Sequence, residues 1–224
     1  MKLLIKAVIQ FFSPQLFNSI QRFNYERNIL PTEFVEHMNR LTSNDLVIDV
    51  GANRGRVSEC LALRGSKVIS FEPNSNAFTK LLSISEKYQN IDAKNLAAGT
   101  KNRSVRLYLH KETARSGADL TQSSSLLSEK PNVSAGIFEE IQEIDFAEFL
   151  ESLNSPVELI KIDIEGYEIE LINHLIDRKV LDNVNRVYLE THERKFKALL
   201  ASTEALKERV INEGYEEKFF FDWH

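Results

Sequence analysis

The stretch DLVIDVGANRG, residues 45–55, decides the fold of this chain. Apolar and β-branched residues lead to Asp49, and Gly51 and Gly55 follow, four positions apart, in a sequence with only eight glycines. Glycine permits a tight turn, and it lets a helix or a ligand approach the backbone closely. The pattern predicts a buried strand, a turn and a helix. In an open parallel sheet, such a turn lies at the edge where ligands bind.

Strand-like and helix-like segments alternate along most of the chain. We expect strands at 46–50, 67–71, 91–95, 157–163, 186–190 and 217–221, with a further strand at 104–109 added to the same sheet. We expect helices to about residue 63, at 76–87, at 167–177, and through residue 210. Strands that are apolar on both faces and alternate with helices predict an α/β fold, a mostly parallel sheet with helices on both faces.

The region before the first strand is expected to be helical. Residues 1–44 read as helices separated by Pro14 and Pro31, which predicts an N-terminal helical extension, 1–44, ahead of one domain, 45–224. Residues 1–12 form an amphipathic pattern. This helix is expected either to pack on its own domain or a second subunit, or to lie shallowly on a membrane surface.

Composition and charge limit the class of partner. The formal net charge is −5, so no basic surface points to nucleic acid, and we expect no nucleic-acid partner. The single cysteine, Cys60, cannot form a disulfide within the chain. A reducing, cytoplasmic compartment fits this composition.

The glycine loop favours a nucleoside without a pyrophosphate. It lacks both the G-x-G-x-x-G and the G-x-x-x-x-G-K-[ST] patterns that cradle phosphates. Glu72 follows the next strand, 23 residues after Asp49, near the spacing at which an acid reaches a ribose hydroxyl pair. The alternative is that Asp49 and Glu72 only cap helices. Together, however, they describe a site for S-adenosylmethionine, with an acid near the loop to meet its ammonium group.

Five segments carry a resemblance to a known family. They are VIDVGANRG, SFEPN, NLAAG (95–99), EIDFAEFL (143–150) and IKIDIEGYEIELI (160–172), in that order. The chain resembles FkbM-type S-adenosylmethionine-dependent methyltransferases from about Asp45 to Ile172. The resemblance implies a class I, Rossmann-like methyltransferase fold and transfer of a methyl group to a hydroxyl of a glycan or another small hydroxylated acceptor.

Within these motifs the resemblance implies a set of cofactor contacts. They are Asp49, Gly51, Ala52, Asn53, Gly55, Glu72, Asn74, Ala97 and Asp163. Glu165, in the last motif, is expected to bind the acceptor.

Methylation of a hydroxyl requires a base that takes its proton as the bond forms. His192 follows the strand 186–190, and its ordinary pKa lies nearest neutrality, so it is the first choice for this role. Asp163 is the second choice, and Glu190 completes the catalytic set. A cap for the helix that begins near Glu193 is the structural alternative for His192.

Asp163, Glu190 and His192 could instead hold Mg²⁺ or Mn²⁺, although the sequence does not favour a metal. The polar stretch 110–134 is too long for a routine connection. We expect it to close over the acceptor and to offer Arg115, Ser124 and Ser125 as contacts. Two rival functions remain open, N-methylation of an amino sugar or small molecule, and a cofactor-binding scaffold without turnover.

Overall fold

The computed structural model describes residues 14–110, 133–194 and 196–223. These residues belong to two compact units that meet in the sequence between Arg40 and Leu41. The expected N-terminal helix at 1–12 lies outside the described residues. Within the described part of the chain, no helix has both the length and the apolar character needed to cross a membrane.

The first unit contains two described helices, α2 (Pro14–Asn28) and α3 (Thr32–Met38). Pro31 stands at the N-cap of α3 with a φ of −58°, which suits a helix start. Phe34 and Met38, four residues apart on α3, are fully buried. These two residues, together with His37, form the buried face of this helix.

The second unit is built on a six-stranded sheet with the order β3-β2-β1-β7-β8-β9. The strands are β1 (Leu46–Val50), β2 (Lys67–Phe71), β3 (Ile91–Lys94), β7 (Val157–Ile162), β8 (Val184–Glu190) and β9 (Phe219–Trp223). Every neighbouring pair in this sheet is parallel. The predicted parallel sheet is confirmed.

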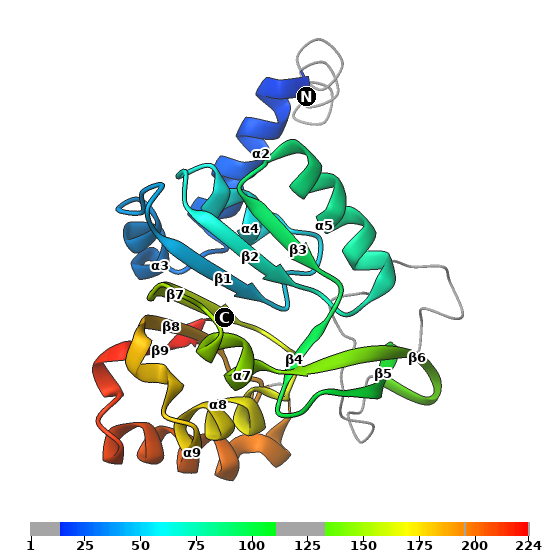
Figure 1. Cartoon of the computed structure of the whole chain (residues 1–224). Coiled ribbons are helices and arrows are strands. Elements are labelled where there is room, and N and C mark those ends of the chain that lie inside the picture. Colours follow the sequence, from blue (N-terminus) through cyan, green and yellow to red (C-terminus); the bar gives the residue numbers. More distant parts are fainter. Residues whose placement is uncertain (1–13, 111–132, 195, 224) are drawn as a thin grey trace. The chain divides into compact units, whose positions relative to one another are not determined.

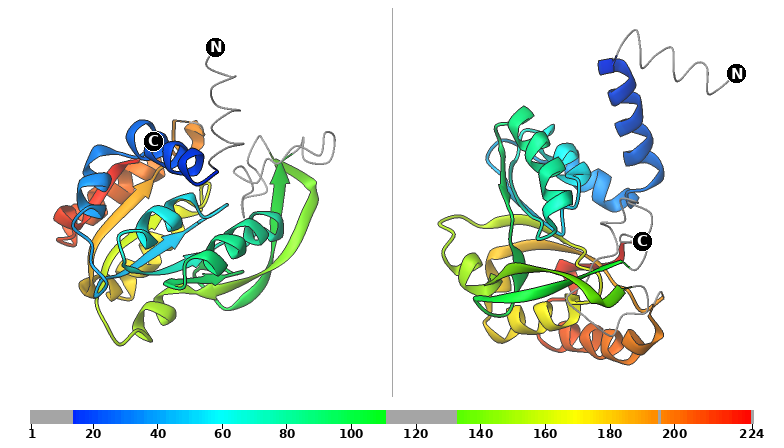
Figure 2. Two further views of the ribbon diagram at one scale, coloured as in Figure 1. Left: turned by 90° about the horizontal axis from the view of Figure 1, so that it is seen from above. Right: turned by 90° about the vertical axis from the view of Figure 1, so that its right-hand side faces the viewer.

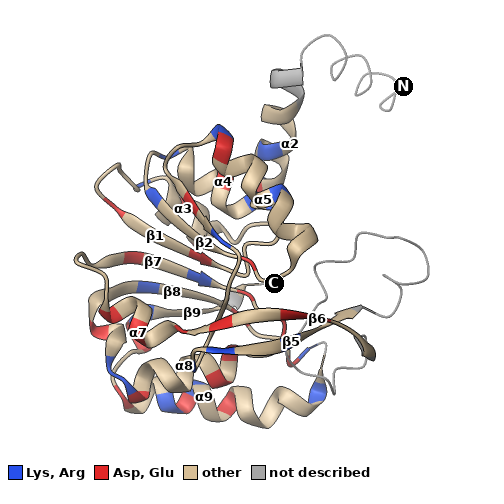
Figure 3. Ribbon diagram, turned by 45° about the vertical axis from the view of Figure 1, so that its right-hand side comes forward, with Lys and Arg blue, Asp and Glu red and all other residues tan. Residues whose placement is uncertain are grey.

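Helices cover both faces of this sheet (Figure 1). On one face lie α4 (Arg56–Ala62) and α5 (Ser75–Lys87); on the other lie α7 (Phe146–Glu151), α8 (Glu168–Asp177) and α9 (Leu200–Asn212). Short 3₁₀ turns at Val180–Asn183, Lys197–Leu199 and Glu216–Lys218 complete the connections. On α9, basic and acidic residues are interspersed (Figure 3). Arg209 of α9 donates to Asn173 and pairs with Asp177, which ties these two helices together.

The core lies between the sheet and its helices. Ile48, Ile160 and Ile162 of the central strands are fully buried and share one cluster with Leu171 and Leu175 of α8. Burial of each such side chain contributes about 1.5–3 kcal/mol relative to exposure. This packing holds the two central strands, β1 and β7, in fixed register.

A second sheet corrects one prediction. The segment expected to extend the main sheet at 104–109 is β5 (Arg103–His110), and it belongs instead to a separate three-stranded sheet with the order β4-β6-β5. Its partners are β4 (Ala97–Gly99) and the long β6 (Val133–Asp145), neither of which the hydrophobic pattern predicted. Figure 2 shows the β5–β6 pair extending beyond the parallel sheet. Residues alternate between exposed and half-buried in the middle of β6, so its apolar signal is weak.

The end of β1 approaches β7 so closely that a side chain does not fit. Gly51 has a φ of +75°, and a Cβ there would stand 1.8 Å from the backbone oxygen of Asp163. Gly55, with a φ of +77°, would bring a Cβ within 2.8 Å of Leu81 on α5. Both glycines of the opening motif thus serve close packing within the chain itself.

We predict that Gly51→Ala destabilises the chain by about 2–4 kcal/mol, because strain at positive φ adds to a clash with backbone that cannot move aside. Gly214→Ala is the matched control, since Gly214 has a φ of +79° and open space around its Cβ position. It should cost only the strain, about 1–2 kcal/mol. Urea unfolding of both variants measures the difference, and equal losses would contradict the clash.

Candidate functional site

The order of the strands places the candidate site at the carboxyl end of the sheet. β1 lies between β2 and β7, and the chain proceeds outward from β1 in one direction and from β7 in the other. At such a switch point, the loops after the two strands diverge and leave a crevice. The backbone N–H of Asp163 donates to the oxygen of Val50, so the ends of β1 and β7 remain joined up to this point.

A buried polar row crosses the sheet just before its carboxyl edge. Ser70, Asp49 and Lys161 are register partners on the adjacent strands β2, β1 and β7. Ser70 donates to the hydroxyl of Ser58 on α4, and Ser58 donates to Asp49 at 2.6 Å. Asp49 is completely buried, and its other oxygen lies 3.5 Å from the amine of Lys161. Asp49 therefore does not cap a helix. Its side chain accepts a hydrogen bond from α4 and lies beside the charge of one buried lysine.

Lys161 is a site residue that the sequence reading missed. Its side chain is 4% exposed, and its amine donates to the oxygen of Gly51 and lies 3.7 Å from Asp163. It connects the glycine loop to the end of β7. A signal for it was present, because Lys161 stands between two isoleucines in the strand VELIKI, and a lysine buried there requires a partner.

Glu72, which follows β2, connects the end of this strand to the glycine loop after β1. Its side chain accepts one backbone N–H from Asn53 and another from Asn74, each at 2.8 Å and each on a different oxygen. Asn53 has a φ of +49°, which turns its N–H towards this carboxylate. Burial raises the pKa of Glu72 to about 7, although both backbone N–H groups favour the charged form. Glu72 is thus a buried acid whose charge can change near neutral pH.

The remaining cofactor residues predicted from the motifs occupy different surroundings. The side chain of Asn74 caps α5 by accepting from Asn76 and Ala77. Ala52 is buried in the loop, and its N–H donates to Phe71. Ala97 lies on β4 in the second sheet, among Leu107 and Ile141. Their contacts with a cofactor stay predictions.

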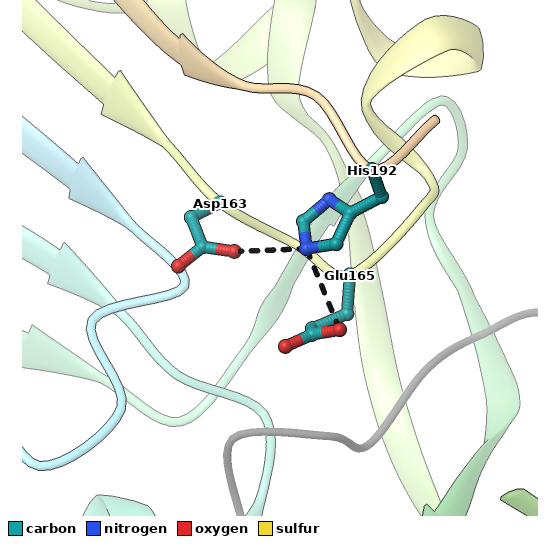
Figure 4. A group of neighbouring side chains, drawn as sticks. All are labelled: Asp163, Glu165 and His192. Carbon is teal, nitrogen blue, oxygen red and sulfur yellow. Dashed lines mark ion pairs between the residues drawn. The ribbon is translucent and has the colours of Figure 1, made fainter. Parts of the chain in front are cut away.

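A cluster of carboxylates surrounds His192 beyond the ends of β7 and β8 (Figure 4). Around its Nε2 lie Glu165 Oε2 at 3.4 Å, Asp163 Oδ1 at 3.7 Å and Glu190 Oε1 at 3.7 Å. Single ligand atoms of Asp163, Glu165 and His192 all lie within 4.8 Å of one another, close enough to share a metal ion. The structure therefore gathers the three predicted catalytic residues and Glu165 in one place.

Glu168 is the second residue that the sequence reading missed. It is 2% exposed, and it accepts the backbone N–H groups of Ile164 and Gly166, both at 2.8 Å. Its Oε1 also lies 3.1 Å from Nδ1 of His192. Glu168 therefore fixes the loop that carries Glu165 and, at the same time, one edge of the imidazole ring.

The imidazole of His192 has no exposed surface. Burial by itself disfavours the charged ring, but Glu168, Asp163 and Glu165 outweigh that effect and raise the pKa of His192 above its ordinary value. The ring does not cap the helix that follows, because its nitrogens face carboxylates. Arg115, Ser124 and Ser125, together with the stretch expected to close over the acceptor, lie outside the described residues.

We predict that Lys161→Met destabilises the chain by about 3–5 kcal/mol, since it leaves Asp49 buried beside an uncharged neighbour. The double variant Asp49→Asn/Lys161→Met should lose clearly less than the sum of the two single losses, because it removes both charges. Denaturant unfolding of the four proteins in this cycle tests the coupling. Additive losses would show that the two charges do not interact.

Comparison with known proteins finds a family match and several solved structures with a similar fold. A family model described as methyltransferase FkbM domain matches residues 49–216, from Asp49 through the site to the turn before β9. No curated protein matches the sequence.

Among solved structures, an rRNA methylase from Streptococcus thermophilus shares 12% identity with this chain, covers 78% of each chain and has a TM-score of 0.42. The N-terminal domain of human METTL16 in complex with SAH shares 14% identity over 86% of this chain and 61% of that one, with a TM-score of 0.41. The fold is the predicted class I, Rossmann-like methyltransferase fold, and the family match covers most of the sequence. The chain belongs to the methyltransferase FkbM domain family.

Proposed function

We propose that this methyltransferase uses S-adenosylmethionine to methylate a hydroxyl group of a carbohydrate, a glycan or a related small hydroxylated acceptor. The observation that carries the cofactor assignment is Glu72. It is a buried acid at the end of the strand beside β1, held 2.8 Å from the backbone of the glycine loop.

The hydrogen bonds of Glu72 leave acceptor positions that a ribose can use. A carboxylate has about four acceptor positions, and the two backbone N–H groups use one on each oxygen. One position on each oxygen remains, which matches the two adjacent hydroxyls of a ribose. Asp163, at the end of β7, is partly exposed and adjoins the glycine loop. We propose that its carboxylate binds the ammonium group of the methionine part.

The chemistry is an in-line displacement. Bound S-adenosylmethionine would supply the methyl group: the acceptor oxygen would bond to the methyl carbon, and the electron pair of the broken carbon–sulfur bond would remain on sulfur. The hydroxyl proton must leave to give a neutral methyl ether. The chain contributes alignment of oxygen, carbon and sulfur, together with a group that assists proton loss.

The His192 cluster supports transfer to oxygen. It lies at the end of β8 and contacts Asp163, so it adjoins the assigned cofactor site. The His192 ring and the carboxylates around it provide groups that can accept the proton of an acceptor hydroxyl. The non-nucleic-acid acceptor, the cytoplasmic location and the role of the N-terminal helix remain predictions from the sequence.

Incubation of the chain with S-adenosylmethionine carrying a labelled methyl group, together with a panel of sugars, glycans and amino sugars, tests the function. We expect label in a methyl ether. Transfer to nitrogen would favour the rival enzyme function, and cofactor binding without transfer to any acceptor would favour the scaffold.

We predict that cofactor affinity falls as the pH drops below about 7, the pKa of Glu72. Ribose hydroxyls donate to the charged carboxylate, so binding expels a proton, and affinity can change by up to about tenfold per pH unit below the pKa. Without cofactor the sign reverses: the raised pKa means that stability contributed by this group declines as the pH rises from 4.5 to about 7.

Calorimetry between pH 5.5 and 8.5 measures this dependence, with those limits spanning about 1.5 units on either side of the pKa. Glu72→Gln should bind more weakly and lose the pH dependence. Glu86→Gln, on the exposed surface of α5, is the control and should match the parent. Undiminished affinity in Glu72→Gln would contradict the ribose assignment.

We predict that His192→Ala lowers turnover by about 10²-fold or more while cofactor affinity is retained. His174→Ala is the matched control, because His174 lies on α8 with its Nε2 2.8 Å from Asp145, away from the cluster. It should turn over like the parent. Steady-state kinetics with a saturating acceptor, together with calorimetry for the cofactor, separate the two effects.

A further inference from the structure

We infer that Asp163, Glu165 and His192 form a binding site for one divalent transition-metal cation. The binding itself follows from the residues and needs no assumption about the reaction; only the role assigned to the cation rests on the proposed function. The sequence pointed to Glu190 as the second carboxylate ligand, whereas the geometry points to Glu165.

The separations fit ligands of one small cation. Two ligand atoms held at about 2.1 Å from a metal, at angles of about 90–110°, lie about 3.0–3.5 Å apart. Nε2 of His192 lies 3.4 Å from Glu165 and 3.7 Å from Asp163. Each carboxylate oxygen thus lies within about 0.2 Å of the range for sharing a cation with the ring nitrogen. The three ligand atoms together lie within 4.8 Å of one another. Figure 4 shows the two carboxylates turned towards the same ring nitrogen.

The ring of His192 is buried and its Nε2 lacks a hydrogen-bond partner. Among the described residues, neither ring nitrogen of His192 nor Oδ1 of Asp163 makes a hydrogen bond, and all three atoms are inaccessible to solvent. Buried polar atoms are nearly always satisfied, so the adjacent pair of Nε2 and Oδ1 needs an explanation. A cation between them would satisfy both at once.

Glu168 provides the outer support that metal-binding histidines usually have. A histidine that binds a metal through one nitrogen typically turns the other towards a carboxylate. Here Nδ1 lies 3.1 Å from Glu168, which is itself held by the backbone of Ile164 and Gly166. Glu168 therefore lies on the Nδ1 side of the ring, while Asp163 and Glu165 lie on the Nε2 side.

The backbone is bent to present Glu165. This residue has a φ of +59° and is followed by Gly166 with a φ of +110°. A non-glycine residue in the left-handed region carries strain, and such strain gathers at functional sites. In this conformation Glu165 extends its carboxylate to His192 rather than to solvent.

Local charge also favours a cation. Besides the two proposed carboxylate ligands, Glu168 and Glu190 lie within 3.7 Å of the ring. The amine of Lys161 approaches Asp163 from the side of the glycine loop, but it also serves Asp49 and Gly51. Four carboxylates therefore surround the ring of His192, with one lysine amine beside Asp163.

The donor set selects the class of metal. One imidazole with carboxylate oxygens suits Mn²⁺ or a later divalent ion better than Ca²⁺, which prefers oxygen ligands alone. Three protein ligands leave further coordination positions open. In the proposed reaction, an acceptor hydroxyl would occupy one of them, and the cation would lower the pKa of that hydroxyl. Glu190, whose Oε1 lies 3.7 Å from Nε2, would receive the proton.

Mn²⁺ titration of the metal-free full chain, followed by electron paramagnetic resonance and calorimetry without cofactor or acceptor, tests the site. We expect one Mn²⁺ per chain. Glu165→Gln should weaken binding by at least about tenfold, and Glu168→Gln by about 10–100-fold through loss of the outer tether. His192→Ala should abolish binding.

Glu170→Gln is the matched control, because Glu170 is an exposed glutamate on the first turn of α8. It should bind Mn²⁺ like the parent. Thermal unfolding monitored by circular dichroism verifies that each variant is folded. Added Mn²⁺ should raise the unfolding temperature of the parent and of Glu170→Gln equally, that of Glu165→Gln and Glu168→Gln less, and that of His192→Ala not at all. Equal Mn²⁺ binding by Glu165→Gln and the parent, or no binding by the parent, would overturn the inference.

The outcomes for the site and for the reaction can be told apart. Methyl transfer by a chain that binds no cation would leave the proposed function standing, with His192 as the base, and would remove the metal. Stoichiometric Mn²⁺ binding without any methyl transfer would retain the metal site and remove the proposed function.

Discussion

The close approach of the ends of β1 and β7 is the constraint on which the rest of the structure depends. Gly51 lies so near the carbonyl of Asp163 that only hydrogen fits in place of a side chain. The strands remain hydrogen-bonded to this point, where Asp163 donates to Val50. The loops after β1 and β7 separate only beyond this contact. Their polar residues therefore lie close to one another at the carboxyl edge of the sheet. A wider junction would spread the same residues along the edge of the sheet.

Much of the fold could be predicted because its signals are local. The strands β1, β2 and β7 are short, mostly apolar runs. In the helices that follow them, apolar residues recur every three to four positions. The gathering of Asp163, Glu190 and His192 also followed from sequence order, since neighbouring parallel strands end at one edge. Their distances could not be predicted, because they depend on a backbone turn at Glu165 that no residue preference announces.

The failures have physical causes of a different kind. β5 was placed in the wrong sheet because an apolar strand pattern does not specify its partner, and β6 is half-exposed. Lys161 and Glu168 act through other residues: one compensates the buried Asp49, and the other holds His192. Such supporting groups make sense only when their partners are known. The motif IKIDIEGYE contains both residues. From the sequence, however, only its acids Asp163 and Glu165 were recognised as candidates for the site.

The pairing of β5 with β6 has a consequence for how this chain can diversify. His110 and Val133 are opposite one another in the antiparallel ladder, although 22 residues separate them in the sequence. The ladder closes the base of that interval independently of its length, and lengthening a closed loop costs little free energy. Insertions and deletions can therefore accumulate between these positions without shifting the register of either sheet. The length of this interval can thus vary without altering the residues at the carboxyl edge of the parallel sheet, which lie elsewhere in the sequence.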